Sequence, residues 1–312
     1  RPPRSTLFPY TTLFRSRILR YQVPGFDTLT LNRKILIYYL SQAALCGRDI
    51  TYDQNYKHNL LIRKTLEGIY AGYSGDKKSE DFAKFEVYLK RVWFSNGIHH
   101  HYSTEKFLPE FSEEYFKTLL MNTPKEQLPL LANQSPDQFV AELTPLIFNP
   151  DVAPKRVSLD DSRDLVLASA ANFYEGVTQP EVEKYYEQLR KTDQARGEDI
   201  RVSYGLNSKV VKENGMVTEK VYKADGLYGA AIQQIISWLG KALPYAETHE
   251  QQISISKLID YYRTGSLKTW DEYNIAWVKD QNALVDFVNG FIEVYGDPMA
   301  MKGSWEDRKS VV

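Results

Sequence analysis

Three consecutive histidines, His99, His100 and His101, precede Tyr102 and form the most unusual cluster of reactive side chains in the sequence. Imidazole nitrogens bind transition metals, but neighbouring side chains on an extended chain point to opposite faces, so the three rings cannot easily converge on one ion. The other interpretations are a solvated turn, or a polar loop that lines a cleft with Tyr102 as a stacking or hydrogen-bonding wall. We favour the cleft loop.

A second metal motif begins at His249 and Glu250 but is not completed. In zinc peptidases with the pattern H-E-x-x-H, two histidines one helical turn apart hold the metal and the glutamate activates water. Positions 253 and 254 of this chain are Ile and Ser, so the second imidazole is missing. The segment therefore predicts the start of a surface helix.

Three acids, Asp286, Glu293 and Asp297, stand out because they lie in or beside the apolar run 285–295. A carboxylate in such surroundings needs either a partner or a function. A structural salt bridge is one explanation. The sharper hypothesis is recognition of a cationic group, such as the amino terminus of a peptide.

The composition excludes several classes of protein. The chain has 312 residues, of which 43% are hydrophobic and 25% charged, so it is large and apolar enough to fold. Its formal net charge of −1 provides no field for nucleic acid, and no stretch approaches the ~18 apolar residues of a membrane span. The single Cys46 cannot form an internal disulfide and is expected in the core. We expect a soluble protein.

The two ends of the chain look foreign to the rest. Residues 1–16 show no helical or strand period, and a DNA sequence that encodes residues 11–16 yields residues 307–312 from its complementary strand, shifted by one base. Both tails can therefore derive from one sequencing adapter. We expect the natural protein to comprise at most residues 17–306, without its natural start, and we expect both tails to pack against nothing.

Helix signals dominate the first half of the chain. Ser79 can cap a helix whose apolar residues recur every three or four positions, and Asn96 can end it. Ser135 starts a capping box with a proline at the first helical position, and the same spacing recurs at Thr178 and Thr269.

The second half alternates between strand and helix signals. Asn214 followed by Gly215 suits the positive φ angles of a tight hairpin turn, and Gly265 is a helix stop. The expected elements are strands within 200–211 and 216–222, helices at about 227–243 and 249–262, and a buried helix or strand at 285–295. The residues thus predict an α+β fold that is mostly helical with a small sheet, and composition places no domain boundary.

The segment W-V-K-D-Q-N-A-L-V-D-F-V-N-G-F-I-E-V-Y-G-D-P at 277–298, followed by K-G-S-W-E at 302–306, resembles a core segment of the dipeptidyl peptidase III family. The stretches RYQVPGF at 20–26, DQNY at 53–56 and VWFSNGIHHHYS at 92–103 are similar to the Bacteroidetes-type branch of that family. The resemblance covers nearly all of residues 17–306.

This resemblance implies a zinc-dependent exopeptidase that removes dipeptides from the amino end of short peptides, with two lobes around a wide cleft. The zinc motifs of the family, H-E-x-x-G-H and E-E-x-x-A, do not occur here. It therefore implies that residues 17–306 are most of the lower, substrate-binding lobe, built of helices around a small β-barrel. Such a fragment would contain neither metal ligands nor catalytic residues and would be inactive alone.

The resemblance also implies roles for individual residues. Asp286 matches a family acid that binds the free amino group of the substrate, although the best-aligned relative has Glu there. Tyr102 falls where the family has an aromatic wall for the second residue of the substrate. Asn96, next to the histidine loop, and Glu293 are further candidates for substrate binding.

Short peptides are thus the implied partners, and zinc is the implied cofactor of the complete enzyme. The compartment stays open: the cytoplasm is favoured, and a periplasmic protein or lipoprotein is the alternative because the natural amino terminus is missing. The competing hypothesis for the function is a nonenzymatic module for peptide binding or interaction, which keeps this lobe without a metal-binding lobe.

Overall fold

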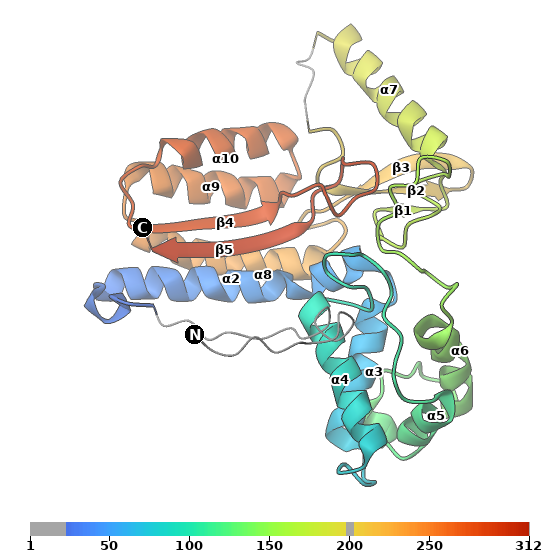
Figure 1. Ribbon diagram of the computed structural model, residues 1–312. Helices are drawn as coiled ribbons and strands as arrows, with labels where there is room; N and C mark the ends of the chain where they lie inside the picture. Colours follow the sequence, from blue (N-terminus) through green and yellow to red (C-terminus); the bar gives the residue numbers. More distant parts are fainter. Residues whose placement is uncertain (1–22, 198–202, 312) are drawn as a thin grey trace, which may run out of the picture.

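The computed structural model describes residues 23–197 and 203–311 (Figure 1). Its helices are α2 (Leu31–Asn55), α3 (Asn59–Gly72), α4 (Glu80–Ser95), α5 (Glu113–Met121), α6 (Pro136–Phe148), α7 (Gln179–Ala195), α8 (Gly229–Ala242), α9 (His249–Thr264) and α10 (Leu267–Lys279). Its strands are β1 (Tyr174–Glu175), β2 (Ser208–Glu213), β3 (Met216–Val221), β4 (Val285–Phe291) and β5 (Trp305–Val311). Helix α2 runs along β5, and α3 and α4 descend from its carboxyl end.

Helices α3 to α6 share one hydrophobic core and form the lower part of the molecule in Figure 1. The expected helix after Ser79 is confirmed as α4: the Ser79 hydroxyl accepts a hydrogen bond from the Phe82 amide, and Asn96 ends the helix in the left-handed conformation at φ 51°. The apolar stripe of α4 is buried in this core at Phe82, Phe85, Leu89 and Val92.

Two of the three expected capping boxes are confirmed. The Ser135 hydroxyl and the Gln138 side chain cap α6 reciprocally, and Glu181 accepts from the amide of Thr178 at the start of α7. The third was wrong, because α10 begins two residues before Thr269. Gly265 ends α9 at φ 70°, so the next residue, Ser266, is free to cap α10.

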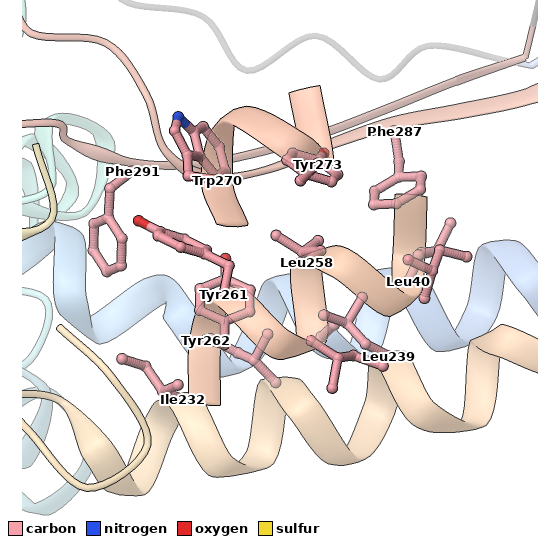
Figure 2. Close-up of a cluster of buried hydrophobic side chains, with 14 of the residues drawn as sticks. Leu40, Ile232, Leu239, Leu258, Tyr261, Tyr262, Trp270, Tyr273, Phe287 and Phe291 are labelled. Carbon is pink, nitrogen blue, oxygen red and sulfur yellow. The ribbon is translucent and has the colours of Figure 1, made fainter. Parts of the chain in front are cut away.

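A second core lies between α2, α8, α9, α10 and the β4–β5 pair (Figure 2). Figure 2 shows side chains from different elements meeting here: Leu40 from α2, Leu239 from α8, Leu258 from α9 and Phe287 from β4. Helix α2 approaches β5 closely at Gly47, where an added Cβ atom would lie 2.0 Å from the Trp305 ring. Cys46 is half-buried against this core, as expected.

Strands β1 to β3 form a three-stranded sheet packed with α7. Strand β1 pairs parallel to β2, and β2 pairs antiparallel to β3 around the expected turn, with Asn214 at φ 51° and Gly215 at φ 80°. This unit has its own small core, which includes Val182 and Tyr186 of α7 and Val210 of β2.

The expected barrel is not formed by the described residues. Strands β4 and β5 pair antiparallel only with each other and pack on α2 and the helices beside it, so they do not close against the β1–β3 sheet. The apolar run 285–295 is a strand as far as Phe291. Within residues 23–197 and 203–311, no helix is long and apolar enough to cross a membrane.

The expectation that both tails pack against nothing was wrong for residues 307–311. They make up most of β5, from Asp307 opposite Asn289 to Val311 opposite Val285. The backbone N–H and C=O groups of β4 need hydrogen-bonding partners, and this segment provides them whatever its origin. Residues 1–16 lie outside the described part of the chain.

Candidate functional site

The D-Q-N-Y segment at the carboxyl end of α2 connects the three parts of the fold. Gln54 is buried and its side-chain amide donates to the Gly303 carbonyl at 3.1 Å, while its oxygen accepts from the Trp305 amide at 2.8 Å. Its backbone carbonyl accepts from the Asn172 amide at 2.8 Å. This one residue therefore fixes the end of α2 to β5 and to the segment that leads into β1.

Asn55, the next residue, connects α2 to the histidine loop. Its side-chain amide donates to the Asn96 carbonyl at 3.0 Å, and its oxygen accepts from Arg156 Nη1 at 2.8 Å. Arg156 Nη2 reaches the His101 carbonyl at 3.4 Å. Asn96 and the histidine loop are thus held in place by the same pair of side chains.

The three histidines have different environments. His99 is buried, its Nε2 lies 2.8 Å from the Ala153 carbonyl, and burial lowers its pKa to about 4, so it is neutral at physiological pH. His100 Nδ1 accepts from the amides of Tyr102 and Ser103 at 3.2 Å each. The loop is therefore a folded turn in which His99 points inward.

Tyr102 is the outermost side chain of this loop, with 84% of its surface exposed. Its ring centroid lies 4.5 Å from that of His101, and the His101 centroid lies 4.9 Å from that of Phe94. Tyr102 therefore belongs to a small aromatic cluster, and most of its surface is available to a ligand.

Asp286 lies on the half-buried face of β4, opposite to the core-facing Val285 and Phe287. Its Oδ1 accepts from the Trp277 indole at 2.9 Å and from the Phe287 amide at 2.7 Å. Within the described part of the chain, Asp286 makes no ion pair and its Oδ2 has no hydrogen-bond donor. The carboxylate is thus held in one orientation and retains an oxygen for an incoming cation.

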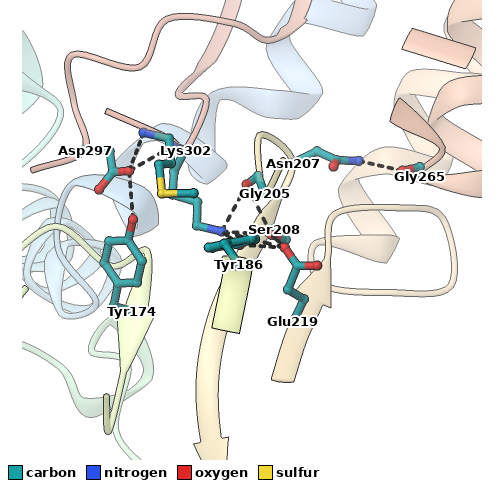
Figure 3. A network of polar contacts seen from close by, with 10 residues as sticks. Tyr174, Tyr186, Gly205, Asn207, Ser208, Glu219, Gly265, Asp297 and Lys302 are labelled. Atoms are coloured by element: carbon teal, nitrogen blue, oxygen red, sulfur yellow. Dashed lines mark hydrogen bonds and ion pairs between the residues drawn. The ribbon is translucent and has the colours of Figure 1, made fainter. Parts of the chain in front are cut away.

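Asp297 is explained by structure alone (Figure 3). It is buried, and its Oδ2 accepts from the Tyr174 hydroxyl at 2.8 Å and from the amides of Met301 and Lys302 at 2.9 Å each. Burial raises its pKa against the effect of these donors. Asp297 therefore closes the turn between β4 and β5 and contacts the β1–β3 sheet.

Lys302, in the same turn, is fully buried and reaches into the same sheet (Figure 3). Its ammonium donates to the Tyr186 hydroxyl, to the Gly205 carbonyl at 3.1 Å and to Ser208 at 3.0 Å, with Glu219 at 3.8 Å as the counter-ion. Burial lowers the pKa of Lys302 to about 8. This turn thus brings two ionisable groups into the interface between β4–β5 and the β1–β3 sheet.

The candidate residues from the sequence fall into two places. Asn96 lines a cavity of ≈ 370 Å³ with Thr51 of α2 and Trp305 of β5, and it is linked to the Tyr102 loop as described above. Glu293 is exposed just beyond the end of β4. Asp286 lies four residues before Gly290, hence about 13 Å along the strand from the cavity end of the β4–β5 pair.

The sequence did not single out Gln54, Arg156 or Lys302. The D-Q-N-Y resemblance pointed to the region of Gln54 but not to its contacts. In the same way, the K-G-S-W-E resemblance included Lys302 but did not indicate its contacts. The local sequence has no signal for the contacts of Arg156 or Lys302, because Arg156 and Asn55 are 101 positions apart and Lys302 and Gly205 are 97 positions apart.

Comparison with known proteins supports the family resemblance. Residues 163–312, which include Asp286 and the β4–β5 turn, match the model of peptidase family M49. This part of the chain is similar to peptidase family M49. Its β4 segment and most of the contacts of Lys302 thus fall within the part that the M49 model covers.

The curated relatives that the chain matches are named dipeptidyl peptidase 3. It is 23% identical to the protein of Dictyostelium discoideum over 92% of this chain and 21% identical to that of Homo sapiens over 92%. The structure is similar to those of dipeptidyl peptidase III from Caldithrix abyssi, with a TM-score of 0.58 and 16% identity, and from Corallococcus sp. strain EGB, with 0.60 and 17%. The resemblance to the dipeptidyl peptidase III family is confirmed, and so is an α+β fold.

The chain spans about two fifths of the length of these relatives. It covers 42% of the Dictyostelium protein, 43% of the human protein and 40% of each solved chain, while 92% or 93% of its own length is matched.

The described residues do not fit the metal site that an M49 peptidase implies. Within 23–197 and 203–311, no three or more His, Cys, Asp or Glu side chains are grouped so that they could hold a metal ion. His249 begins the exposed end of α9, capped by Thr248, as expected for a surface helix. No step of the chemistry can therefore be derived from a metal held by these residues.

Proposed function

We propose that this chain is the substrate-holding part of a dipeptidyl peptidase III, an exopeptidase that releases dipeptides from the amino end of short peptides. The observation that carries the proposal is the M49 match across the segment that contains Asp286. The state of that carboxylate supports it, because Asp286 is fixed on one oxygen while the other has no partner within the described part of the chain.

Asp286 binds the amino terminus of the peptide in this proposal. An ammonium group placed at Oδ2 gains a charge-assisted hydrogen bond, which is shorter and stronger than a neutral one. The Trp277 indole and the Phe287 amide keep the carboxylate from rotating toward other partners. A fixed anchor for the first residue determines which peptide bond lies at the reaction centre, and this would give cleavage after a constant number of residues.

Tyr102, Asn96 and Glu293 complete the peptide site in this proposal. The exposed Tyr102 ring offers an apolar face to a substrate side chain, and Asn96 contributes to the wall of the nearby cavity. Glu293 is exposed beyond the end of β4, where a carboxylate would attract the cationic end of a peptide.

We propose that the metal of the complete enzyme is zinc and that it is held by residues outside this sequence. When bound, zinc would supply an activated water molecule. The chain alone is then inactive, and after dialysis it should hold no stoichiometric zinc by elemental analysis. One tightly bound zinc per chain would contradict this, because the described residues present no suitable ligand group.

The proposed function can be tested by comparing how the wild type and Asp286→Asn bind a labelled short peptide. Fluorescence anisotropy of the label measures the affinity. Asparagine keeps the shape and an oxygen for Trp277 but removes the charge. The affinity for a peptide with a free amino end should fall roughly tenfold to a hundredfold, the value of one hydrogen bond to a charged group.

The control peptide is the same sequence with an acetylated amino end. It should bind weakly to the wild type and no worse to Asp286→Asn. The control variant Asp161→Asn removes a charge from an exposed loop and should change neither affinity. If Asp286→Asn weakens both peptides equally, Asp286 has only a structural role, and if no peptide binds the wild type, the proposed function is wrong.

A further inference from the structure

Arg156 is a half-buried cation that lacks an acid partner. Its guanidinium donates to two neutral oxygens, Asn55 Oδ1 at 2.8 Å and the His101 carbonyl at 3.4 Å. It makes no ion pair with any residue in the described ranges. Arginine stays protonated in proteins, so this side chain keeps a full charge in a site where the described residues supply no counter-ion.

The groups around Arg156 do not compensate its charge. Burial lowers the pKa of Arg156, and the Tyr295 phenol, after β4, opposes this. The nearby acid Glu306 of β5 accepts from the Tyr295 hydroxyl at 3.4 Å. The pKa of His101 is lowered by burial, then by His100 and then by Arg156, and its Nδ1 is buried without a hydrogen-bond partner among the described residues. The site therefore combines a positive potential with unused donor capacity.

Partly enclosed charges in proteins are normally paired, and a planar guanidinium matches a carboxylate in two parallel hydrogen bonds. The position of Arg156 adds to this. It is linked through Asn55 to Asn96 and bonds directly to the His101 carbonyl of the Tyr102 loop, so it lies beside the candidate peptide site.

We propose that Arg156 binds a carboxylate of the peptide, with His101 beside it as a second donor. This rests on the proposed function and deepens it: the substrates are short peptides that carry a carboxylate near the Tyr102 loop, at a distance from the ammonium at Asp286. The carboxylate comes either from the carboxyl terminus of the peptide or from an acidic side chain, and both offer the same chemistry to Arg156.

The test is the affinity of four labelled peptides of one sequence, all with free amino ends. They carry a free carboxyl terminus, a terminal amide, a terminal amide with one internal Glu, and a terminal amide with Gln in its place. The wild type should bind a carboxylate-bearing peptide about tenfold or more tightly than its neutral counterpart. The first pair of peptides reports on the terminus and the second on the side chain.

Arg156→Gln should abolish this preference, while the penalty for amino-terminal acetylation should persist. Arg156→Lys keeps the charge but loses the planar fork, so a reduced preference should remain. The control Arg163→Gln removes an exposed arginine of the same segment, with 74% of its side chain accessible, and should behave like the wild type.

Two results would overturn the inference while leaving the proposed function intact. One is a wild type that binds peptides through their amino ends without any preference for a carboxylate. The other is an Arg156→Gln variant that folds, by circular dichroism, and weakens charged and neutral peptides equally. The wild-type measurement decides even if Arg156→Gln fails to fold. No binding of any peptide would instead overturn the proposed function, and this inference with it.

Discussion

The buried ammonium of Lys302 should make the stability of this protein increase on going from neutral to alkaline pH. Its pKa is about 8 in the folded chain against an ordinary value of 10.5. Between these two values the unfolded chain binds more protons than the folded one, so the free energy of unfolding rises with pH. From pH 7 to 9.5 this linkage yields about 2 kcal/mol, because folding no longer has to bury a charge.

Urea unfolding followed by tryptophan fluorescence measures this effect when wild type and Lys302→Met are compared at pH 7.0 and 9.5. The difference between the unfolding free energies of the two proteins removes the contribution of other groups. One of these is Lys106, because burial lowers its pKa to about 8 as well. The wild type should gain about 2 kcal/mol over the variant between the two pH values.

The matched control is Lys257→Met. Lys257 lies on the surface of α9, and its ion pair with Glu272 raises its pKa, so its charge persists in both states up to the ordinary value. The difference between the wild type and Lys257→Met should therefore be constant from pH 7.0 to 9.5. If the difference for Lys302→Met is equally constant, or decreases, the ammonium is not buried as a poorly compensated charge.

Two further predictions concern stability. Deletion of residues 307–312 should destabilise the chain by clearly more than the roughly 1 kcal/mol expected for an unanchored tail, because 285–289 of β4 would lose their only strand partner within the described chain; an unchanged melting temperature would show that β5 ends at Glu306. Ser135→Ala should cost about 1 kcal/mol in urea unfolding through loss of the α6 cap, and no change would mean that this helix end is already frayed.

Local signals in the sequence were sufficient for most elements. Ser79 and Asn96 marked the ends of α4, and Asn214–Gly215 marked the β2–β3 turn, because caps and tight turns depend on a few adjacent residues. The misplaced start of α10 has the same origin. Both Ser266 and Thr269 can cap a helix, and the choice between them is made by Gly265, which ends α9 immediately before Ser266.

The contacts that assemble the site could not be predicted in this way. Gln54 bonds to Gly303 across 249 positions, and Lys302 bonds to Gly205 across 97. Such pairs follow from how α2, the β4–β5 turn and the β1–β3 sheet pack together. No periodicity in the sequence of any of these elements predicts them. The barrel was expected from the family resemblance, whereas the residues themselves predicted only a small sheet. Whether two sheets close into a barrel depends on the direction in which each strand edge faces, and the described strands form two separate sheets.

The acids of the 285–297 segment show how structure adds a criterion that sequence lacks. In the sequence, Asp286 and Asp297 pose the same question, since both lie in or beside an apolar run. Both carboxylate oxygens of Asp297 have hydrogen-bond donors within the chain: Oδ2 accepts three hydrogen bonds, and Oδ1 accepts one from the Met299 amide at 3.2 Å. Among the described residues, Asp286 has donors on one oxygen only and no cation beside it. Because a half-buried carboxylate with unused acceptor capacity is costly unless something binds it, Asp286 and not Asp297 is the acid to which a ligand should be assigned.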